Sequence, residues 1–262
     1  MKRSGVILAL MLLVICSDLV ISYASPDEDA LFEAARTGDT QKINLILRKV
    51  ININAKNGQW KTPLMVALEN NQLETAKLLL SKRAGVDEKD KDWRTALMLA
   101  AYKGRTESVK LLLSHGANVR LGDKAGVTAL MFTVQKSNRD IAELLISKGA
   151  DVNSQDIRAK KVLMYAVEND YIEKDDRGRY ETVKLLISKG ANVKTSDLNG
   201  WTPIRYAVSS MGAPAADENI IKLLISKGAN ANEGTGIYSL LKLAERVGNE
   251  KVVEILKQSG AR

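Results

Sequence analysis

A six-residue phrase recurs along this chain at a nearly fixed interval. Its five copies are TPLMVA at 62–67, TALMLA at 95–100, TALMFT at 128–133, KVLMYA at 161–166 and TPIRYA at 202–207. The small residues that close the first four copies stand at positions 67, 100, 133 and 166, so their spacing is constant. A second phrase, LLLSHGANV or a close variant of it, follows each copy. This period indicates that the chain is built from stacked copies of one supersecondary unit.

The phrase T-P-L-x-x-A at this constant spacing resembles the ankyrin repeat, whose period is about 33 residues. The resemblance implies an all-α solenoid of about seven helix-turn-helix units joined by hairpin-like loops. We expect an N-terminal capping repeat at 25–57, central repeats at 58–235 and a C-terminal capping repeat at 236–262. The composition fits this fold, because 45% of the residues are apolar and only 5% are aromatic. Such a core is made mainly of Leu, Ile, Val and Ala in thin helical layers.

Residues 92–124 illustrate the expected unit. Thr95 is predicted to cap a first helix that stops at Gly104. A second helix over 106–114 is predicted to end at Gly116, which supplies a left-handed residue. The chain then turns outward into a loop whose tip contains residues 125–126, before the next first helix.

Two repeats are longer than the period. Ala166 and Ala207 are further apart than the constant spacing of the earlier copies, and so are Ala207 and Ala244. We expect the extra residues near 171–180 and 211–217, as insertions between the first and second helices of neighbouring repeats. Two interpretations stay open: tolerated surface loops, whose closure costs little, or a second contact surface.

Residues 1–24 are typical of a signal peptide. Lys2 and Arg3 precede an apolar run over 6–15, and Ser22-Tyr23-Ala24 is a small-x-small pattern for cleavage. We expect an exported protein, periplasmic or secreted, with no membrane insertion after cleavage. A lipoprotein anchored at Cys16 and an uncleaved anchor over 6–24 stay open. Cys16 is the only cysteine, so the mature chain would contain no disulfide.

Candidate binding residues follow from the resemblance. In ankyrin repeats, the residues before the Thr-Pro-Leu phrase lie at hairpin tips, and those after the small residue face outward on the first helix. Together they line a concave binding face. All three tryptophans fall at such tips, and Trp, Tyr and Arg often dominate binding energy at interfaces. The predicted protein-binding residues are Trp60, Lys61, Trp93, Arg94, Tyr102, Lys103, Lys136, Arg158, Lys160, Trp201 and Tyr238.

The charge predicts the kind of partner. The formal net charge is +8, which favours anionic partners without indicating nucleic acid. We expect a monomer that binds another protein with an acidic surface through this basic, tryptophan-containing face. Nucleic-acid binding is not expected, because the chain contains no nucleic-acid recognition motif. Two alternatives remain: a structural or protective protein of the cell envelope, and a secreted effector delivered to a host cell.

Catalytic and metal-binding residues are scarce. His115 is the only histidine, and it occupies the position at the end of a second helix where sister repeats carry Lys. We therefore expect no enzymatic activity and no cofactor. The family phrase usually has His at its fourth position, whereas this chain has Met65, Met98, Met131 and Met164. We interpret these methionines as packing residues; a soft-metal site is disfavoured, because successive layers lie roughly 10 Å apart.

Overall fold

The computed structural model describes residues 25–49, 51–168, 176–209 and 214–262. Within these ranges the chain folds into seven consecutive pairs of α-helices, which confirms the predicted all-α solenoid. The pairs are α2 (Pro26–Thr37) with α3 (Thr40–Ile46), α4 (Pro63–Glu69) with α5 (Leu73–Ser81), α6 (Ala96–Tyr102) with α7 (Thr106–Ser114), α8 (Ala129–Gln135) with α9 (Arg139–Ser147), α10 (Val162–Val167) with α11 (Asp176–Ser188), α12 (Pro203–Ser209) with α13 (Pro214–Ser226), and α14 (Leu240–Val247) with α15 (Glu250–Gln258). A short 3-10 helix, η1 (Gly236–Tyr238), precedes α14.

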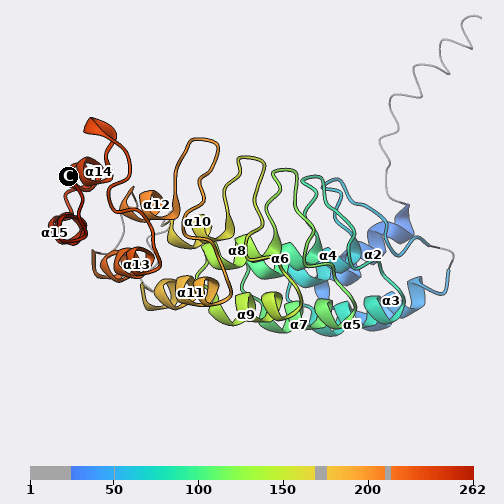
Figure 1. Ribbon diagram of the computed structural model, residues 1–262. Helices are drawn as coiled ribbons and strands as arrows, with labels where there is room; N and C mark the ends of the chain where they lie inside the picture. Colours follow the sequence, from blue (N-terminus) through green and yellow to red (C-terminus); the bar gives the residue numbers. More distant parts are fainter. Residues whose placement is uncertain (1–24, 50, 169–175, 210–213) are drawn as a thin grey trace, which may run out of the picture.

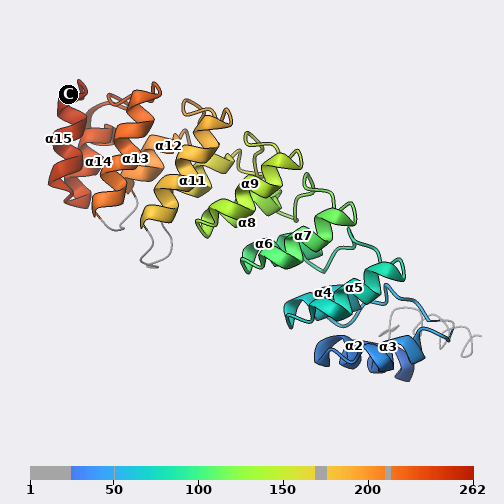
Figure 2. The same cartoon turned by 90° about the horizontal axis from the view of Figure 1, so that it is seen from below.

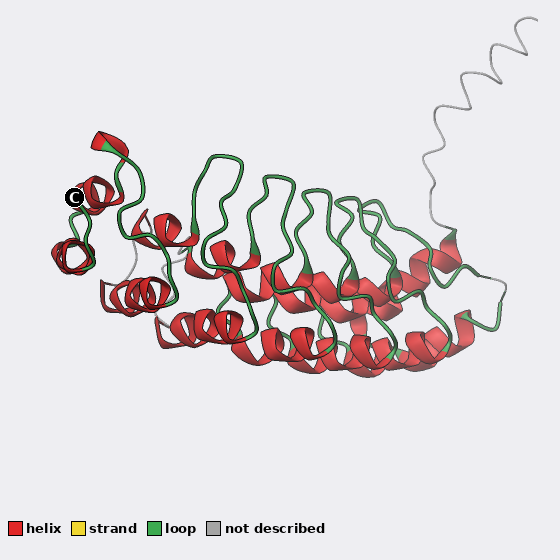
Figure 3. Cartoon of the chain, viewed as in Figure 1, coloured by secondary structure: helices red, strands yellow, loops and turns green. Residues whose placement is uncertain are grey.

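The helix pairs stack in chain order. Each first helix contacts the first helix of the next pair, as α4 does with α6 and α6 with α8. The first helices form one layer and the second helices another, and the loops between pairs rise from the first layer (Figures 1 and 3). Seen from below, the pairs follow one another along a shallow arc (Figure 2). The loops therefore form a continuous edge along the whole stack.

Threonine hydroxyls cap four of the first helices. Before α12, Thr202 accepts a hydrogen bond from the backbone N–H three residues later, at 3.3 Å. The other three are alike. The hydroxyls of Thr62, Thr95 and Thr128 each accept a hydrogen bond from the backbone N–H three residues later. Each of these three threonines has an extended backbone, as an N-cap requires. In the fifth repeat Lys161 replaces the threonine, and its side chain accepts no such bond. The predicted cap at Thr95 is confirmed.

Small and flexible side chains fill the space between the pairs. The residues that close the recurring phrase are at most 3% exposed, so the first helices pack closely: Ala67, Ala100, Thr133, Ala166 and Ala207. The four methionines of the phrase are at most 1% exposed. The sulfur of Met131 also accepts a hydrogen bond from the backbone N–H of Thr128, at 3.4 Å. Their burial supports the interpretation that these methionines serve packing.

The described parts of the two insertions lengthen second helices. Both α11 and α13 have 13 residues, whereas α5, α7 and α9 have nine. Residues 176–180 and 214–217, expected in loops, are therefore helical. Pro214 stands at the first position of α13, where the missing N–H costs nothing, and the two alanines after it favour helix. Residues 169–175 and 210–213 lie outside the described residues.

The described residues contain no helix that is both long enough and apolar enough to cross a membrane. The predicted signal peptide, with Cys16, lies outside the described residues.

Candidate functional site

Five of the loop tips are each built around one acidic or amide side chain. The carboxylate of Asp90 accepts hydrogen bonds from the backbone N–H groups of Asp92 and Arg94, both at 2.9 Å. Equivalent pairs of bonds are made by Asn57, Asp123, Asp156 and Asp197. This side chain mimics a backbone turn and fixes the tip. None of these residues was predicted from the sequence, although they recur with the period of the repeat.

The third residue after this side chain has a left-handed backbone. Its φ is 77° at Gly126 and 75° at Gly200, where glycine suits the conformation. Trp60 and Trp93 hold the same position with φ of 59° and 64°. A bulky side chain with positive φ is a genuine outlier. Both side chains are nevertheless mainly in solvent, since Trp60 is 63% exposed and Trp93 is 55% exposed.

Neighbouring tips are joined by backbone hydrogen bonds. The N–H groups of Lys91, Lys124, Ile157 and Leu198 donate to carbonyls of the preceding tip, over 2.9–3.3 Å. The acceptors are the carbonyls of Gln59, Asp92, Ala125 and Arg158. We call Lys91, Lys124, Ile157 and Leu198 the tip row. All four side chains are exposed, so the tip row forms one fixed edge of the molecule. The sequence contains the signal for it, because each member directly follows the turn-forming aspartate.

Internal ion pairs neutralise two of the predicted binding cations. Lys61 lies 2.7 Å from the carboxylate of Glu69, and both side chains are less than a third exposed. Arg94 contacts two carboxylates: that of the buried Asp90 at 3.2 Å and that of Asp92 at 3.0 Å. These pairs leave little uncompensated charge at the two positions. The predicted basic stripe is therefore weaker here than the sequence indicates.

The other predicted cations differ in exposure. Lys103 is exposed at the end of α6. Arg158 is exposed at a tip, with its guanidinium 3.6 Å from Asp156. The ammonium of Lys136 lies 5.2 Å from the ring centroid of Tyr102, and Tyr102 packs edge-on against Phe132. Tyr102 and Lys136 are thus brought together by adjacent repeats.

The structure places Lys160 in the interior. This residue is only 4% exposed, and its ammonium contacts the carboxylate of Glu168. The ammonium also lies 4.6 Å from the ring centroid of Tyr165 and 4.5 Å from that of Tyr206. We call these four residues the lysine clasp. Lys160 therefore stabilises the stack and is not part of the exposed face.

Two buried aspartates support the clasp. The hydroxyl of Tyr165 donates to Asp156 and that of Tyr206 donates to Asp197, both at 2.8 Å. Burial and the aspartate partner raise the pKa of each tyrosine well above its usual value. Burial opposes ionisation of Asp197, yet hydrogen bonds from Trp201, Tyr206 and Asn199 prevail and lower its pKa.

The remaining predicted aromatic residues have different environments. Trp201 is half-buried and packs edge-on against Tyr206, with ring centroids 5.2 Å apart. Tyr238 is 72% exposed on η1, and its backbone carbonyl accepts a hydrogen bond from Arg205. Trp201 is thus partly a packing residue, whereas Trp60, Trp93 and Tyr238 present their rings to solvent.

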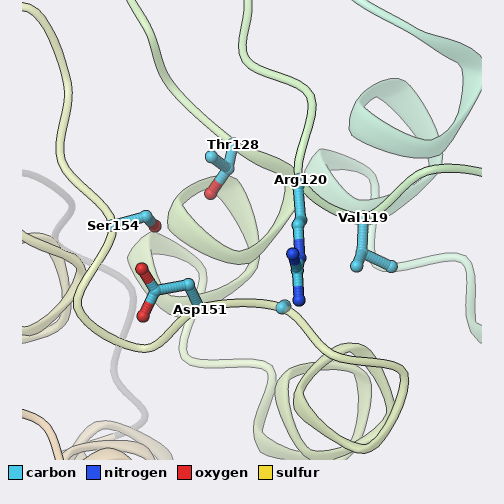
Figure 4. A pocket seen from close by; sticks show the side chains of 6 residues that line it. Val119, Arg120, Thr128, Asp151 and Ser154 are labelled. Carbon is cyan, nitrogen blue, oxygen red and sulfur yellow. The ribbon is translucent and has the colours of Figure 1, made fainter.

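Small hollows lie between loops and do not resemble a catalytic site. One, of about 340 Å³, is lined by residues that include Val119, Arg120 and Thr128 (Figure 4). A second, of about 230 Å³, is lined two repeats later by the equivalent Val193, Lys194 and Thr202. The hollows therefore follow from the repeat geometry. The described residues include no cluster of three or more His, Cys, Asp or Glu side chains that could hold a metal ion.

His115 has a local role. It caps the carboxyl end of α7, and its Nδ1 lies 2.9 Å from the carbonyl oxygen of Leu111. A polar or cationic side chain is favourable at this end of a helix.

The stacked helix pairs and the fixed row of tips define a helical repeat solenoid, a class of protein with an extended binding surface. Three copies of a family model described as "Ankyrin repeats (3 copies)" match residues 8–92, 82–156 and 163–262. The chain belongs to the ankyrin-repeat family. Members of this family are generally non-enzymatic, and their repeats generally act as protein–protein interaction modules.

A solved structure supports the family assignment. The chain is similar to the crystal structure of an ankyrin repeat domain from Acinetobacter baumannii AYE, with a TM-score of 0.67 and 28% sequence identity. The similarity covers 76% of this chain and 98% of that domain. No curated protein matches the chain.

Proposed function

We propose that this chain is a non-enzymatic binding module that holds another protein across its loop tips and concave face. Trp60 and Trp93 are its main aromatic anchors. The observation that carries the proposal is that both side chains are more than half exposed on a left-handed backbone.

An exposed tryptophan side chain on a left-handed backbone does not contribute to the stability of the fold. A left-handed backbone costs roughly 1–2 kcal/mol for a residue other than glycine. The two tryptophans regain little of this by burial. Of the sister tips, Ala159 also has a positive φ, 60°, whereas Gly126 and Gly200 avoid the cost. Residues with a strained backbone conformation occur mainly at functional sites. Tryptophan is also the side chain most enriched among residues that dominate binding energy.

The experiment is crosslinking and capture from the native host, using the full-length chain with a carboxyl-terminal tag. The test variant is Trp60→Gly with Trp93→Gly. The matched control is Arg83→Gly, which removes a large side chain at another left-handed position, φ 67°, after α5. A protein captured by the wild type and by the control, but not by the test variant, would support the proposal. Identical captured sets would contradict it.

The same capture experiment addresses the structural alternative. A structural or protective envelope protein that only self-associates would crosslink to copies of itself with no dependence on the tip tryptophans. We favour a monomer, which sedimentation of the purified protein would check.

We also propose that the chain acts outside the cytoplasm after loss of residues 1–24. The charged start, apolar run and small-x-small site support this location. Mass spectrometry of the protein from its host tests it: a chain that begins at Ser25 supports cleavage, a lipid on Cys16 supports the lipoprotein alternative, and an intact leader argues against both. Recovery from culture medium or from a host cell would favour the effector alternative over a periplasmic protein.

A further inference from the structure

The side chains of the tip row change from cationic to apolar halfway along its length. Its first two members, Lys91 and Lys124, are exposed cations. Its last two, Ile157 and Leu198, are 69% and 74% exposed. All four occupy one equivalent position, so the change is not caused by different backbone geometry. Two large apolar side chains exposed on neighbouring tips contribute nothing to the core.

The basic half of the tip row is not compensated locally. No ion pair involves Lys91 or Lys124 within the described part of the chain. Carboxylates next to them in the sequence are engaged elsewhere: Asp92 pairs with Arg94, and Asp123 accepts two backbone N–H groups at 2.8 and 2.9 Å. The exposed ring of Trp93 lies on the tip of Lys91, and that of Trp60 lies on the tip before it. The basic half therefore favours carboxylates on a partner.

The apolar half continues into the last repeat. Ile237 and Tyr238, on η1 in the next loop along the stack, are 70% and 72% exposed. Arg205 holds this loop through a hydrogen bond of 2.8 Å to the carbonyl of Tyr238. Exposed apolar side chains thus occur on three successive loops, and such grouping marks a binding surface.

We propose that the tip row binds a polypeptide segment of a partner protein that carries carboxylates at one end and apolar side chains at the other. The acidic end lies beside Lys91 and Lys124, and the apolar end covers Ile157 and Leu198. This inference rests on the proposed function and specifies the chemistry of its partner. With layers roughly 10 Å apart, the row is about 30 Å long. An extended segment rises about 3.3 Å per residue, so about nine residues match the row.

The test is selection of random twelve-residue peptides on the immobilised full-length protein. Two variants probe the halves separately: Lys91→Glu with Lys124→Glu, and Ile157→Ser with Leu198→Ser. The control, Lys189→Glu with Lys222→Glu, makes the same charge change at exposed positions of the second-helix layer. All these side chains are exposed, so we expect unchanged helical circular dichroism.

We expect selected peptides to combine an acidic end with an apolar end. Each tip-row variant should weaken their binding at least tenfold, and the control should not. Raising the salt concentration should weaken binding to the wild type and have little effect on residual binding to the lysine variant. Selection of no peptide, selection of peptides without carboxylates, or equal binding to both tip-row variants and the wild type would overturn the inference.

Failure of this inference is distinguishable from failure of the proposed function. If native capture depends on Trp60 and Trp93 but is unchanged by both tip-row variants, the protein is a binding module whose partner lacks the proposed chemistry. If capture is independent of the tryptophans, the proposed function fails.

Discussion

The ammonium of Lys160 lies 4.5 Å from the ring centroid of Tyr206, which belongs to the next repeat of the stack. Lys160 is at the tip that precedes α10, whereas Tyr206 is on α12. Because Lys160 also contacts Glu168 and lies over Tyr165, the lysine clasp joins a tip, its own first helix and the following repeat. Contacts between neighbours determine the stability of a solenoid.

We expect Lys160→Met to lower the free energy of unfolding by about 2–3 kcal/mol, because it removes a desolvated cation–π contact and leaves Glu168 unpaired. The matched control is Lys61→Met. Lys61 and Glu69 form the same pair eight residues apart, with side chains 17% and 27% exposed and no tyrosine clasp. The control should lose at most about 1 kcal/mol. Urea unfolding followed by circular dichroism checks both values, and equal losses would contradict the role of the clasp.

Alkaline pH should destabilise the protein through Tyr165. Burial and Asp156 raise its pKa in the folded state above the usual value of 10.0. The folded protein therefore holds the phenol proton more tightly than the unfolded chain does. This contribution to stability is complete below about pH 10 and is lost as pH rises above it. Within the clasp Tyr165 also faces Lys160, and Arg158 lies near it.

Melting temperatures between pH 7 and pH 11 check this prediction. The wild type should lose stability above about pH 10 more steeply than Tyr165→Phe does. Tyr238→Phe is the control, because Tyr238 is 72% exposed and should leave the wild-type slope unchanged. If the melting temperatures of all three proteins fell in parallel with pH, the alkaline loss of stability would not arise from Tyr165.

Arg83→Gly should stabilise the protein. Arg83 has φ of 67° at the end of the second helix, where the sister repeats carry Gly116, Gly149, Gly190 and Gly228. Glycine relieves the left-handed strain but adds entropy to the unfolded chain. We expect a net gain of about 0.5–1 kcal/mol. The adjacent Lys82→Gly is the control: its φ is −90°, so only the entropic cost remains and stability should fall. A loss of stability in both variants during urea unfolding would show that no strain is relieved.

Glu233→Gln should loosen the last repeat. The carboxylate of Glu233 accepts a bond from the Thr202 hydroxyl and pairs with Arg205 at 2.9 Å. Both charged side chains are less than 20% exposed, so the loss should be about 1.5–3 kcal/mol. Hydrogen exchange should quicken in α14 and α15 and stay unchanged in α4 to α7, because solenoid repeats couple mainly to neighbours. Uniformly faster exchange along the chain would argue against a contact that stabilises only the last repeat.

Some structural features could be predicted from the sequence, and others depend on contacts between repeats. Thr95 is in the recurring phrase and caps its helix as expected, because capping depends on neighbours three residues away. Residues 214–217 were expected in a loop and are helical, since proline at a first helical position and two alanines favour helix more than the length of the insertion indicates. Lys160 was expected on the binding face and is buried, because its burial depends on Tyr206 in another repeat.

By itself, the sequence determined the family, the paired helices and the presence of all three tryptophans at loop tips, because each follows from a pattern that recurs within one repeat. Only the tertiary structure decided which of the predicted cations remain available. Lys61, Arg94 and Lys160 are neutralised by carboxylates that the fold brings to them. Lys91 and Lys124, which were not among the predicted binding residues, form no ion pair within the part of the chain that the structure describes. The physical reason is that exposure and pairing of a charge depend on how the tip folds onto its own first helix and stacks against the next repeat.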